Sequence, residues 1–301
     1  KMKNVITIFL FLIIGFTTTA QEKENKPLRI IAIGAHPDDC DFKFGGTAAL
    51  FSEMGHKVKF LTLTNGDAGH QNMGGGVLGN RRRKEANKAG KILGVEYEVL
   101  DNHDGELLPN LEVRNQVIRK IREWNADIVL GLRPNDYHPD HRNAGIIVQD
   151  AAYLVIVPNV VPDTPALKKN PVFFYMNDNF KKPYPFSRDV AIVIDKVMKK
   201  KIQALAAHES QMFEWGPWTN GVKTETIPEN SEERLEWLNN KYNGRREFNQ
   251  TELNAIKTWY PSLDISGVKN AEFFELCEYG YQPKKEELAQ LFPMLNRKIT
   301  N

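Results

Sequence analysis

Cysteine is scarce in this sequence of 301 residues, which contains only Cys40 and Cys277. At most one disulfide could form, and we expect both thiols to stay unpaired, because lone cysteines tend to behave as small buried apolar residues. Cys277 lies in the segment 274–277, which we expect to be helical. An excess of charge of one sign is also missing. The net charge is +2 and the pI is near 8.4, so the composition gives no reason to expect a nucleic-acid partner.

Long hydrophobic runs are missing as well. The apolar stretch from Val5 to Phe16 is shorter than the roughly 20 residues of a membrane-spanning helix, and the mean hydropathy is −0.46. Lys1 and Lys3 precede this stretch and Thr17–Ala20 follows it, an order typical of a secretory signal. We therefore expect a signal peptide over residues 1–20 that is cleaved after Ala20, and export to the periplasm or the medium. The mature protein would then have no stable membrane span; an uncleaved anchor is the alternative.

A glycine-rich phosphate-binding motif is absent after the first expected strand. The fingerprint G-x-G-x-x-G would stand there in a dinucleotide-binding enzyme, but residues 34–39 read G-A-H-P-D-D. No repeat of 20–50 residues is evident either. These absences argue against a nucleotide cofactor and against a repeat architecture.

Strand-like and helix-like segments alternate along the first two thirds of the chain. The expected strands are residues 28–34, 57–64, 95–100, 127–132, 171–176 and 189–194. The expected helices are residues 45–55, 80–93, 111–124, 142–154 and 195–212. This alternation predicts an α/β fold with a Rossmann-like, mostly parallel sheet covered by helices on both faces. We expect one domain over residues 27–301, since a chain of this length can bury a single large core.

Two short polar stretches follow expected strands, the first directly and the second after residues 133–137. They are A-H-P-D-D at residues 35–39 and H-P-D-H at residues 138–141. Because ligands gather beyond the carboxyl ends of parallel strands, both stretches would meet at one edge of the sheet. A catalytic zinc ion usually takes three His or carboxylate ligands and keeps one position open for water. The sequence therefore predicts a catalytic metal site at this edge.

Each polar residue of the two stretches has a place in such a site. His36, Asp39 and His141 form the expected ligand set, while Asp38 and His138 stand beside ligands, where they would handle protons. Asp140 would orient His138, or else cap a turn. Either stretch alone also fits an ordinary turn, but the pair favours metal. We expect Zn²⁺, with another divalent metal such as Fe²⁺ as the alternative.

The two motifs resemble those of the PIG-L (LmbE-like) family of zinc-dependent de-N-acetylases. That family's first motif is A-H-P-D-D-x-E followed by a glycine pair, and Asp41 here takes the place of the glutamate. Its second motif, H-P-D-H, is matched at every position. Weaker matches are Arg82-x-x-Glu85-Ala86, Asp104-Gly105-x-Leu107 and His208-x-Ser210-Gln211.

The resemblance implies a hydrolase that removes the acetyl group from an N-acetylglucosamine-type sugar or glycoconjugate. In such a mechanism, Asp38 would take a proton from the attacking water, and His138 would stabilise the oxyanion and deliver a proton to the leaving amine. The matches would also bring Arg82, Asp104 and His208 close to the substrate. The expected partner is thus a small-molecule or glycan substrate, and the sequence gives no indication of the oligomeric state.

The stretch 213–268 differs in character, because it combines several tryptophans with many charged residues and has the weakest resemblance to the family. The tryptophans are Trp215, Trp218, Trp237 and Trp259. Their rings would stack on sugar rings if the stretch is a lid or a substrate wall, or would pack it onto the core.

Other functions fit part of the sequence. A non-catalytic zinc- or sugar-binding protein would need the metal ligands but neither Asp38 nor His138. An amidase that acts on a non-sugar N-acyl substrate remains open. A glycosidase would use two carboxylates and no metal, and nothing in the sequence selects such a pair.

Overall fold

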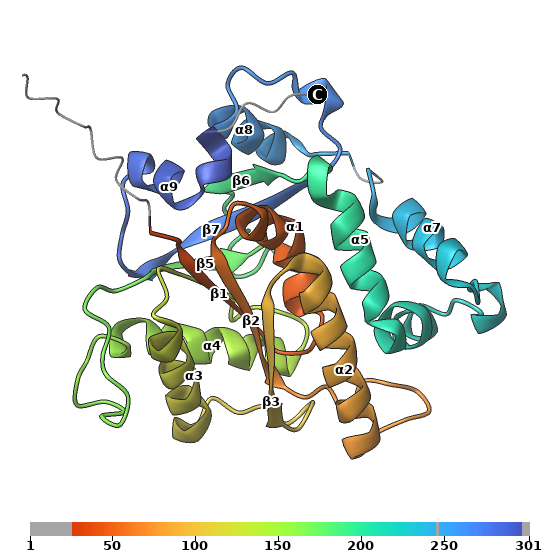
Figure 1. Cartoon of the computed structure of the whole chain (residues 1–301), viewed down its shortest axis with the longest axis horizontal. Helices are drawn as coiled ribbons and strands as arrows, with labels where there is room; N and C mark the ends of the chain where they lie inside the picture. The colour runs from red at the N-terminus through yellow and green to blue at the C-terminus, as the bar shows by residue number, and fades with distance from the viewer. Residues whose placement is uncertain (1–25, 245–246, 297–301) are drawn as a thin grey trace, which may run out of the picture.

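A seven-stranded sheet forms the centre of the computed structural model, which describes residues 26–244 and 247–296 (Figure 1). The expected signal peptide, residues 1–20, lies outside the described residues. The strands are β1 (Arg29–Gly34), β2 (Lys57–Thr64), β3 (Glu96–Asn102), β4 (Ile128–Gly131), β5 (Val172–Met176), β6 (Val190–Val193) and β7 (Ala271–Gly280). Their order across the sheet is β3-β2-β1-β4-β5-β7-β6. β1 to β5 pair in parallel, and β7 pairs antiparallel with β5 and β6.

The central strands are short continuous apolar runs because helices cover both faces of the sheet. Ile30–Ile33 of β1 and Ile128–Leu130 of β4 are completely buried. The helices are α1 (Asp39–Glu53), α2 (Gly75–Leu93), α3 (Leu111–Trp124), α4 (Pro139–Leu154), α5 (Met198–Ala207), α6 (Gly216–Thr219), α7 (Ser231–Tyr242), α8 (Gln250–Trp259) and α9 (Lys285–Leu291). α1, α2 and α5 lie together on one face, and α3 and α4 lie on the other (Figure 1). The predicted mostly parallel α/β fold is thus confirmed.

Within the described part of the chain, no helix combines the length and the apolar content that crossing a membrane requires. This finding concerns residues 26–244 and 247–296, and the apolar stretch of the expected signal is not among them.

Three helices begin earlier than the sequence indicates, and two of these extensions take in the polar motifs. α1 begins at Asp39 instead of residue 45, and α4 begins at Pro139 instead of residue 142. Proline suits the first position of a helix because its missing N–H would have no helical partner there. The side chain of His138 then caps α4 by accepting a hydrogen bond from the N–H of Asp140. The first motif therefore ends where α1 begins, and the second motif forms the N-cap and the first turn of α4.

The segment 274–277, expected to be helical, lies instead in strand β7. Phe274 pairs with Met176 of β5 on one side and with Val190 of β6 on the other. These pairings join segments that are far apart in the sequence. A short apolar run is compatible with either a helix or a strand, so the pairings decide its conformation. Cys277 and Cys40 are both buried and free.

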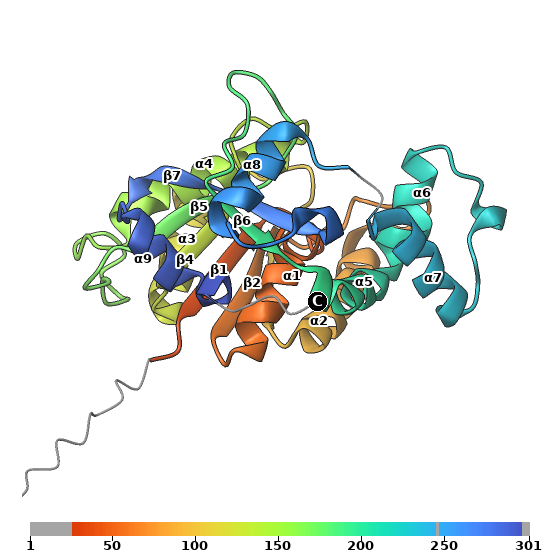
Figure 2. The ribbon, with the colours of Figure 1, turned by 90° about the horizontal axis from the view of Figure 1, so that it is seen from above.

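The stretch 213–268 contains α6, α7 and α8, and Figure 2 shows α6 and α7 beyond α5, away from the sheet. A π-helical turn, Ser210–Trp215, leads into it. Ser210 donates hydrogen bonds from its hydroxyl and its backbone N–H to the carboxylate of Glu85 on α2, at 2.6 and 3.0 Å. These two hydrogen bonds attach the π-helical turn, and with it the start of the stretch, to α2.

Candidate active site

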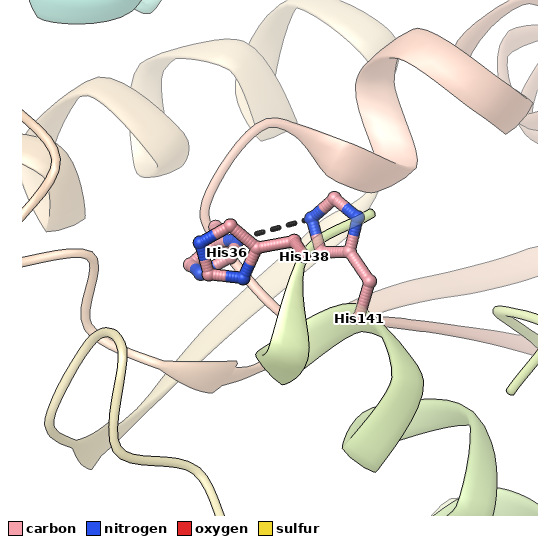
Figure 3. A group of neighbouring side chains, drawn as sticks. All are labelled: His36, His138 and His141. Carbon is pink, nitrogen blue, oxygen red and sulfur yellow. Dashed lines mark hydrogen bonds between the residues drawn. The ribbon is translucent and has the colours of Figure 1, made fainter. Parts of the chain in front are cut away.

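The two polar motifs meet because β1 and β4 are neighbours in the sheet. Ile30 of β1 is in register with Ile128 of β4. The chain passes from β1 to β2 on one side, whereas β4 lies on the other side, so the order of the strands reverses at this point. The crevice beyond the carboxyl ends of the strands at such a reversal is where ligands bind in open α/β sheets. Figure 3 shows His36, which follows β1, beside His138 and His141 from the start of α4.

Three donor atoms converge between the motifs. His36 Nδ1 lies 3.2 Å from His141 Nε2. A carboxylate oxygen of Asp39, Oδ1, lies 3.3 Å from His141 Nε2, and its Oδ2 lies 3.8 Å from His36 Nδ1. Donors bound at about 2.0–2.2 Å around a tetrahedral zinc ion are separated by about 3.3–3.6 Å. The two contacts of His141 Nε2 are thus close to the spacing of zinc ligands, whereas Asp39 approaches His36 Nδ1 at a longer 3.8 Å through its other oxygen.

Outer carboxylates fix which imidazole nitrogens carry protons. His36 Nε2 faces Asp104 Oδ1 at 3.0 Å and Asp140 Oδ2 at 3.2 Å, so its proton is directed toward these carboxylates. His141 Nδ1 faces Asp136 Oδ1 at 3.0 Å in the same way. When both imidazoles are neutral, the two nitrogens that face each other, His36 Nδ1 and His141 Nε2, are both lone-pair donors. A cation between them satisfies both, and a carboxylate behind each histidine is the usual support of a metal ligand. The residues therefore fit a divalent metal.

His138 also brings a ring nitrogen to this centre, because one donor atom from each of His36, His138 and His141 lies within 4.8 Å of the others. Asp104 and Asp140 form a second group with His36, but they face its Nε2, away from His141. Asp39 offers a carboxylate oxygen 3.3 Å from His141 Nε2, and the ring nitrogen of His138 is the alternative third donor. The Oδ2 atom of Asp39 accepts the N–H groups of Ala35 and His36 at 2.9 Å each, which leaves Oδ1 toward His141.

Close packing around Asp39 requires a glycine at the end of β1. A Cβ atom on Gly34 would lie 2.7 Å from Asp39 Cβ, closer than such atoms approach. Gly34 thus lets the first turn of α1 fold back against the strand.

Asp38 lies beside the ligands and is held from several directions. Its φ of 131° is rare for a residue with a side chain. Arg82 Nη2 lies 3.5 Å from its Oδ2 and donates to the carbonyl of Pro37 at 2.8 Å. Burial raises the pKa of Asp38 to about 6, an effect that Arg82 opposes and the charge of Asp39 reinforces. A carboxyl group with this pKa can accept and release a proton near neutral pH.

The pKa of Asp39 shifts in the opposite direction to that of Asp38. Burial alone would raise the pKa of Asp39, but the charges of His141 and His36 outweigh it and lower that pKa to about 2. The two adjacent carboxyl groups therefore differ, one suited to hold a cation and the other to exchange a proton.

His138 stays neutral near pH 7. Burial lowers its pKa, and the positive charges of His36 and His141 lower it further. Because its Nδ1 accepts the Asp140 N–H at 3.2 Å, the ring proton is on Nε2 and can be donated.

These side chains share one cavity of about 710 Å³. Its lining includes His36, Asp38, Asp39, His138 and His141. Arg82 and Asp104 also line it, as the sequence predicts for substrate contacts, with Asp104 Oδ2 lying 3.8 Å from Arg82 Nη1. The lining also includes Gln211 and Trp215 of the π-helical turn and Tyr242 of α7. The volume is in the range of small-molecule sites.

Two of the predicted roles do not fit the structure. The carboxylate of Asp140 lies against His36 Nε2 and accepts the N–H groups of Gly105 and Leu107, so it orients His36 and not His138. The helical first turn explains this, since it directs the Asp140 side chain away from the capping ring of His138. His208 is completely buried, with Nε2 3.2 Å from Asp41 Oδ2, and is not in the lining of the cavity. It is therefore not placed to contact a substrate.

Sequence reasoning missed several residues of the site. Asp136 precedes the second motif by two positions and supports His141, and a carboxylate so close to a ligand was a usable signal. Gln211 belongs to a segment that resembles the family, but the neighbouring His208 was preferred. Tyr97 contacts Asp38 from strand β3, and nothing in its local sequence indicates this.

Comparisons with known proteins agree with this geometry. The family described as GlcNAc-PI de-N-acetylase (PIG-L) matches residues 31–152. The diacetylchitobiose deacetylase of Thermococcus kodakarensis is 32% identical over 216 residues, which cover 67% of this chain and 78% of that protein. A probable N-acetyl-alpha-D-glucosaminyl L-malate deacetylase 2 of Bacillus cereus is 28% identical over 193 residues, covering 60% and 83%.

A solved structure shares the fold. The N,N'-diacetylchitobiose deacetylase from Pyrococcus horikoshii has a TM-score of 0.60 at 22% identity, covering 82% of this chain and 83% of that one. The matched segment contains both histidine motifs, which the fold brings together at the reversal of strand order. The motifs, the fold and the extended likeness to the Thermococcus protein lead to one assignment: the chain belongs to the PIG-L family.

Proposed function

We propose that the protein is a zinc-dependent hydrolase that removes the acetyl group from an N-acetylglucosamine-type sugar or glycoconjugate. The observation that carries the proposal is the pair of imidazole nitrogens, His36 Nδ1 and His141 Nε2, that face each other at 3.2 Å with Asp39 beside them in the cavity. When both imidazoles are neutral, a cation between these nitrogens satisfies both lone pairs, and a metal with three protein ligands and an open position is typical of hydrolysis. The named activities of the relatives support an amide of an acetylated amino sugar as the substrate class.

When bound, the metal supplies a polarised carbonyl and a water molecule that ionises near neutral pH. Asp38 would accept a proton from the attacking water as the water oxygen bonds to the amide carbon, a role for which its raised pKa suits it. His138 Nε2–H donates to the oxygen that becomes negative as the amide carbon turns tetrahedral. The leaving amine takes a proton from Asp38 or His138 as the carbon–nitrogen bond breaks, giving acetate and the free amino sugar.

Arg82 and Asp104 support the same site from the adjoining wall. Arg82 is almost completely buried, and its two terminal nitrogens donate to the carbonyls of Gly66 and Pro37 at 3.1 and 2.8 Å. A side chain at Gly66 would collide with the Arg82 guanidinium. We assign Arg82 to holding the Asp38 loop. Asp104 offers its second oxygen, Oδ2, to a sugar hydroxyl.

Metal analysis together with product release tests the proposal. Purified protein should hold about one zinc ion and release free amine and acetate from N-acetylglucosamine or diacetylchitobiose. Asp38→Asn should keep the metal and lose about 10²–10⁴-fold in turnover, the usual contribution of a general base. Asp163→Asn is the matched control, since that carboxylate pairs with Arg119 on an exposed surface.

The alternatives give different results in the same assay. A non-catalytic binding protein would hold metal and sugar but release no amine from any sugar. An amidase for other substrates would cleave a non-sugar N-acetyl amide and leave the sugars intact. Normal turnover by Asp38→Asn would move the base to another residue.

A further inference from the structure

The backbone at Asp38 is strained, and something must hold it. Its φ of 131° and ψ of −27° lie outside the regions that residues with a side chain normally adopt. Such conformations persist only where the surroundings fix them, and they gather at functional sites. The conformation matters here because it turns the Asp38 carboxyl into the cavity while the next residue, Asp39, begins α1.

A tyrosine hydroxyl on a separate strand binds this strained residue. The backbone N–H of Asp38 donates to the hydroxyl of Tyr97, on β3, at 3.0 Å. Near the start of α1 the helix itself provides no acceptor for this N–H. The Tyr97 ring is fixed by an edge-to-face contact with Phe60 of β2, with 5.4 Å between ring centroids.

The tyrosine is oriented in turn by two buried side chains. Its hydroxyl donates to Asp41 Oδ2 at 2.9 Å, and the same oxygen lies 3.2 Å from His208 Nε2. Asp41 and His208 have no exposed surface. Because the hydroxyl proton is directed to Asp41, the oxygen presents a lone pair to the Asp38 N–H.

We propose that the Tyr97 hydroxyl, oriented by Asp41 and His208, is a positioning group that holds the strained backbone of Asp38 and so aims its carboxyl at the reacting atoms. The proposal rests on the function proposed above, in which Asp38 is the base. It also assigns the buried His208 a role in orienting the Tyr97 hydroxyl, in place of the expected contact with the substrate. Tyr97 acts through Asp38 and is absent from the cavity lining among the described residues.

Tyr97→Phe tests this role, since it removes the hydroxyl and keeps the ring that packs on Phe60. A shift of about 1 Å in a catalytic group can cost about 10²-fold, so we expect kcat to fall by roughly 10- to 100-fold. KM and zinc content should change less than about twofold, because Tyr97 contacts neither the substrate nor the atoms proposed to bind the metal. In an Asp38→Asn background the same change should add almost nothing to the loss, because the group being positioned is already disabled.

Tyr260→Phe is a matched control. The Tyr260 hydroxyl also accepts a backbone N–H, from Val193 at 3.3 Å, and lies outside the cavity lining. Its loss should leave kcat unchanged. An equal fall in kcat for both variants, or an equal fall caused by Tyr97→Phe with and without Asp38→Asn, would show a general structural effect and overturn the proposal.

Amide hydrogen exchange gives a readout that does not need activity. In zinc-loaded protein labelled with ¹⁵N-aspartate, exchange at the Asp38 amide should speed up at least tenfold in Tyr97→Phe and stay unchanged in Tyr260→Phe. Unchanged exchange at Asp38 would overturn the positioning role even if the enzyme is active. If the unmutated protein releases no amine, the proposed function fails separately, and the exchange result still decides the role of the hydroxyl.

Discussion

Asp136 Oδ1 lies 3.0 Å from His141 Nδ1, while the other ring nitrogen of His141, Nε2, faces His36 Nδ1. The same carboxylate oxygen accepts the backbone N–H of His138 at 3.1 Å. One acidic side chain thus sets the tautomer of a ligand and the loop that leads into α4. Burial raises the pKa of Asp136, but the hydrogen bond and charge of His141 outweigh it, and the net shift is downward.

Asp136→Asn should weaken zinc binding by about 10- to 100-fold, the usual effect of losing a carboxylate behind a ligating histidine. The fold should persist, because the amide can still accept both N–H groups. Competition with a fluorescent zinc chelator measures the affinity, and Asp163→Asn serves as the control. Equal affinity in the two variants would show that Asp136 shapes only the loop.

The third ligand can be identified by comparing Asp39→Asn with His138→Ala. We expect Asp39→Asn to lose bound zinc, because a neutral amide is a poor ligand and its one oxygen is already needed by the N–H groups of Ala35 and His36. His138→Ala should retain about one zinc and lose about 10²–10³-fold in turnover, as expected for an oxyanion donor. Metal analysis of both variants decides the matter. Zinc loss in His138→Ala with retention in Asp39→Asn would exchange the two assignments.

Zinc binding should release protons. In metal-free protein, burial lowers the pKa of His36, but hydrogen bonds to Asp104 and Asp140 and the charge of Asp39 outweigh it and raise the pKa to about 10. His36 is therefore protonated at pH 7.5, and zinc must displace about one proton. Calorimetric titrations in two buffers with different ionisation enthalpies should differ in heat accordingly. Identical heats in the two buffers would contradict a protonated His36.

The same pKa shift sets the sign of a stability change. A raised folded-state pKa stabilises the metal-free protein fully below about pH 6.5, the value of an unperturbed histidine, and this stability is lost as the pH rises toward 10. The Tm of metal-free protein should therefore fall from about pH 7 to pH 10. Zinc-loaded protein, in which His36 holds no Nδ1 proton, should show a smaller fall. A metal-free Tm that rises over this range would contradict the shift.

Features that depend on interactions between residues close together in the sequence could be predicted, whereas those that depend on distant residues could not. The parallel strands and both histidine motifs could be recognised because their signals are local: apolar runs of strand length, two of which are followed by His-Pro-Asp. β7 was not recognisable, because Phe274 becomes part of a strand through pairing with Met176 and Val190, which are distant in sequence. Sequence therefore predicted the edge of the sheet that contains the site, and not the strand that completes the sheet.

Orientation explains the remaining errors at the site. Asp140 is adjacent to His138 in the chain, yet the helical turn directs its carboxylate to His36. His208 is adjacent to a segment that lines the cavity, yet its ring points to Asp41. Motif spacing gives which residues come near each other, but the direction of a side chain depends on the backbone geometry of its element.

We propose that tryptophans of the stretch 213–268 select the glycan beyond the reacting sugar. Trp215 lines the cavity and stacks on Trp218, with centroids 5.2 Å apart and 15° between the rings. Trp218 is 52% exposed, so the stacked pair continues from the cavity to the surface. Trp259 belongs to the same stretch but donates from Nε1 to the carbonyl of Asp189 and does not line the cavity.

Trp215→Ala and Trp218→Ala should each reduce kcat/KM for an acetylated oligosaccharide more than for N-acetylglucosamine, by about tenfold. Binding energy from the remote sugars is available to the transition state only if those sugars reach the rings. Trp259→Ala should reduce kcat/KM equally for both substrates and lower the Tm, because the indole N–H of Trp259 hydrogen-bonds to the backbone. If Trp215→Ala also reduced both substrates equally while Tm fell, these rings would be packing the stretch onto the core, and a substrate-selecting wall would have to be sought elsewhere around the cavity.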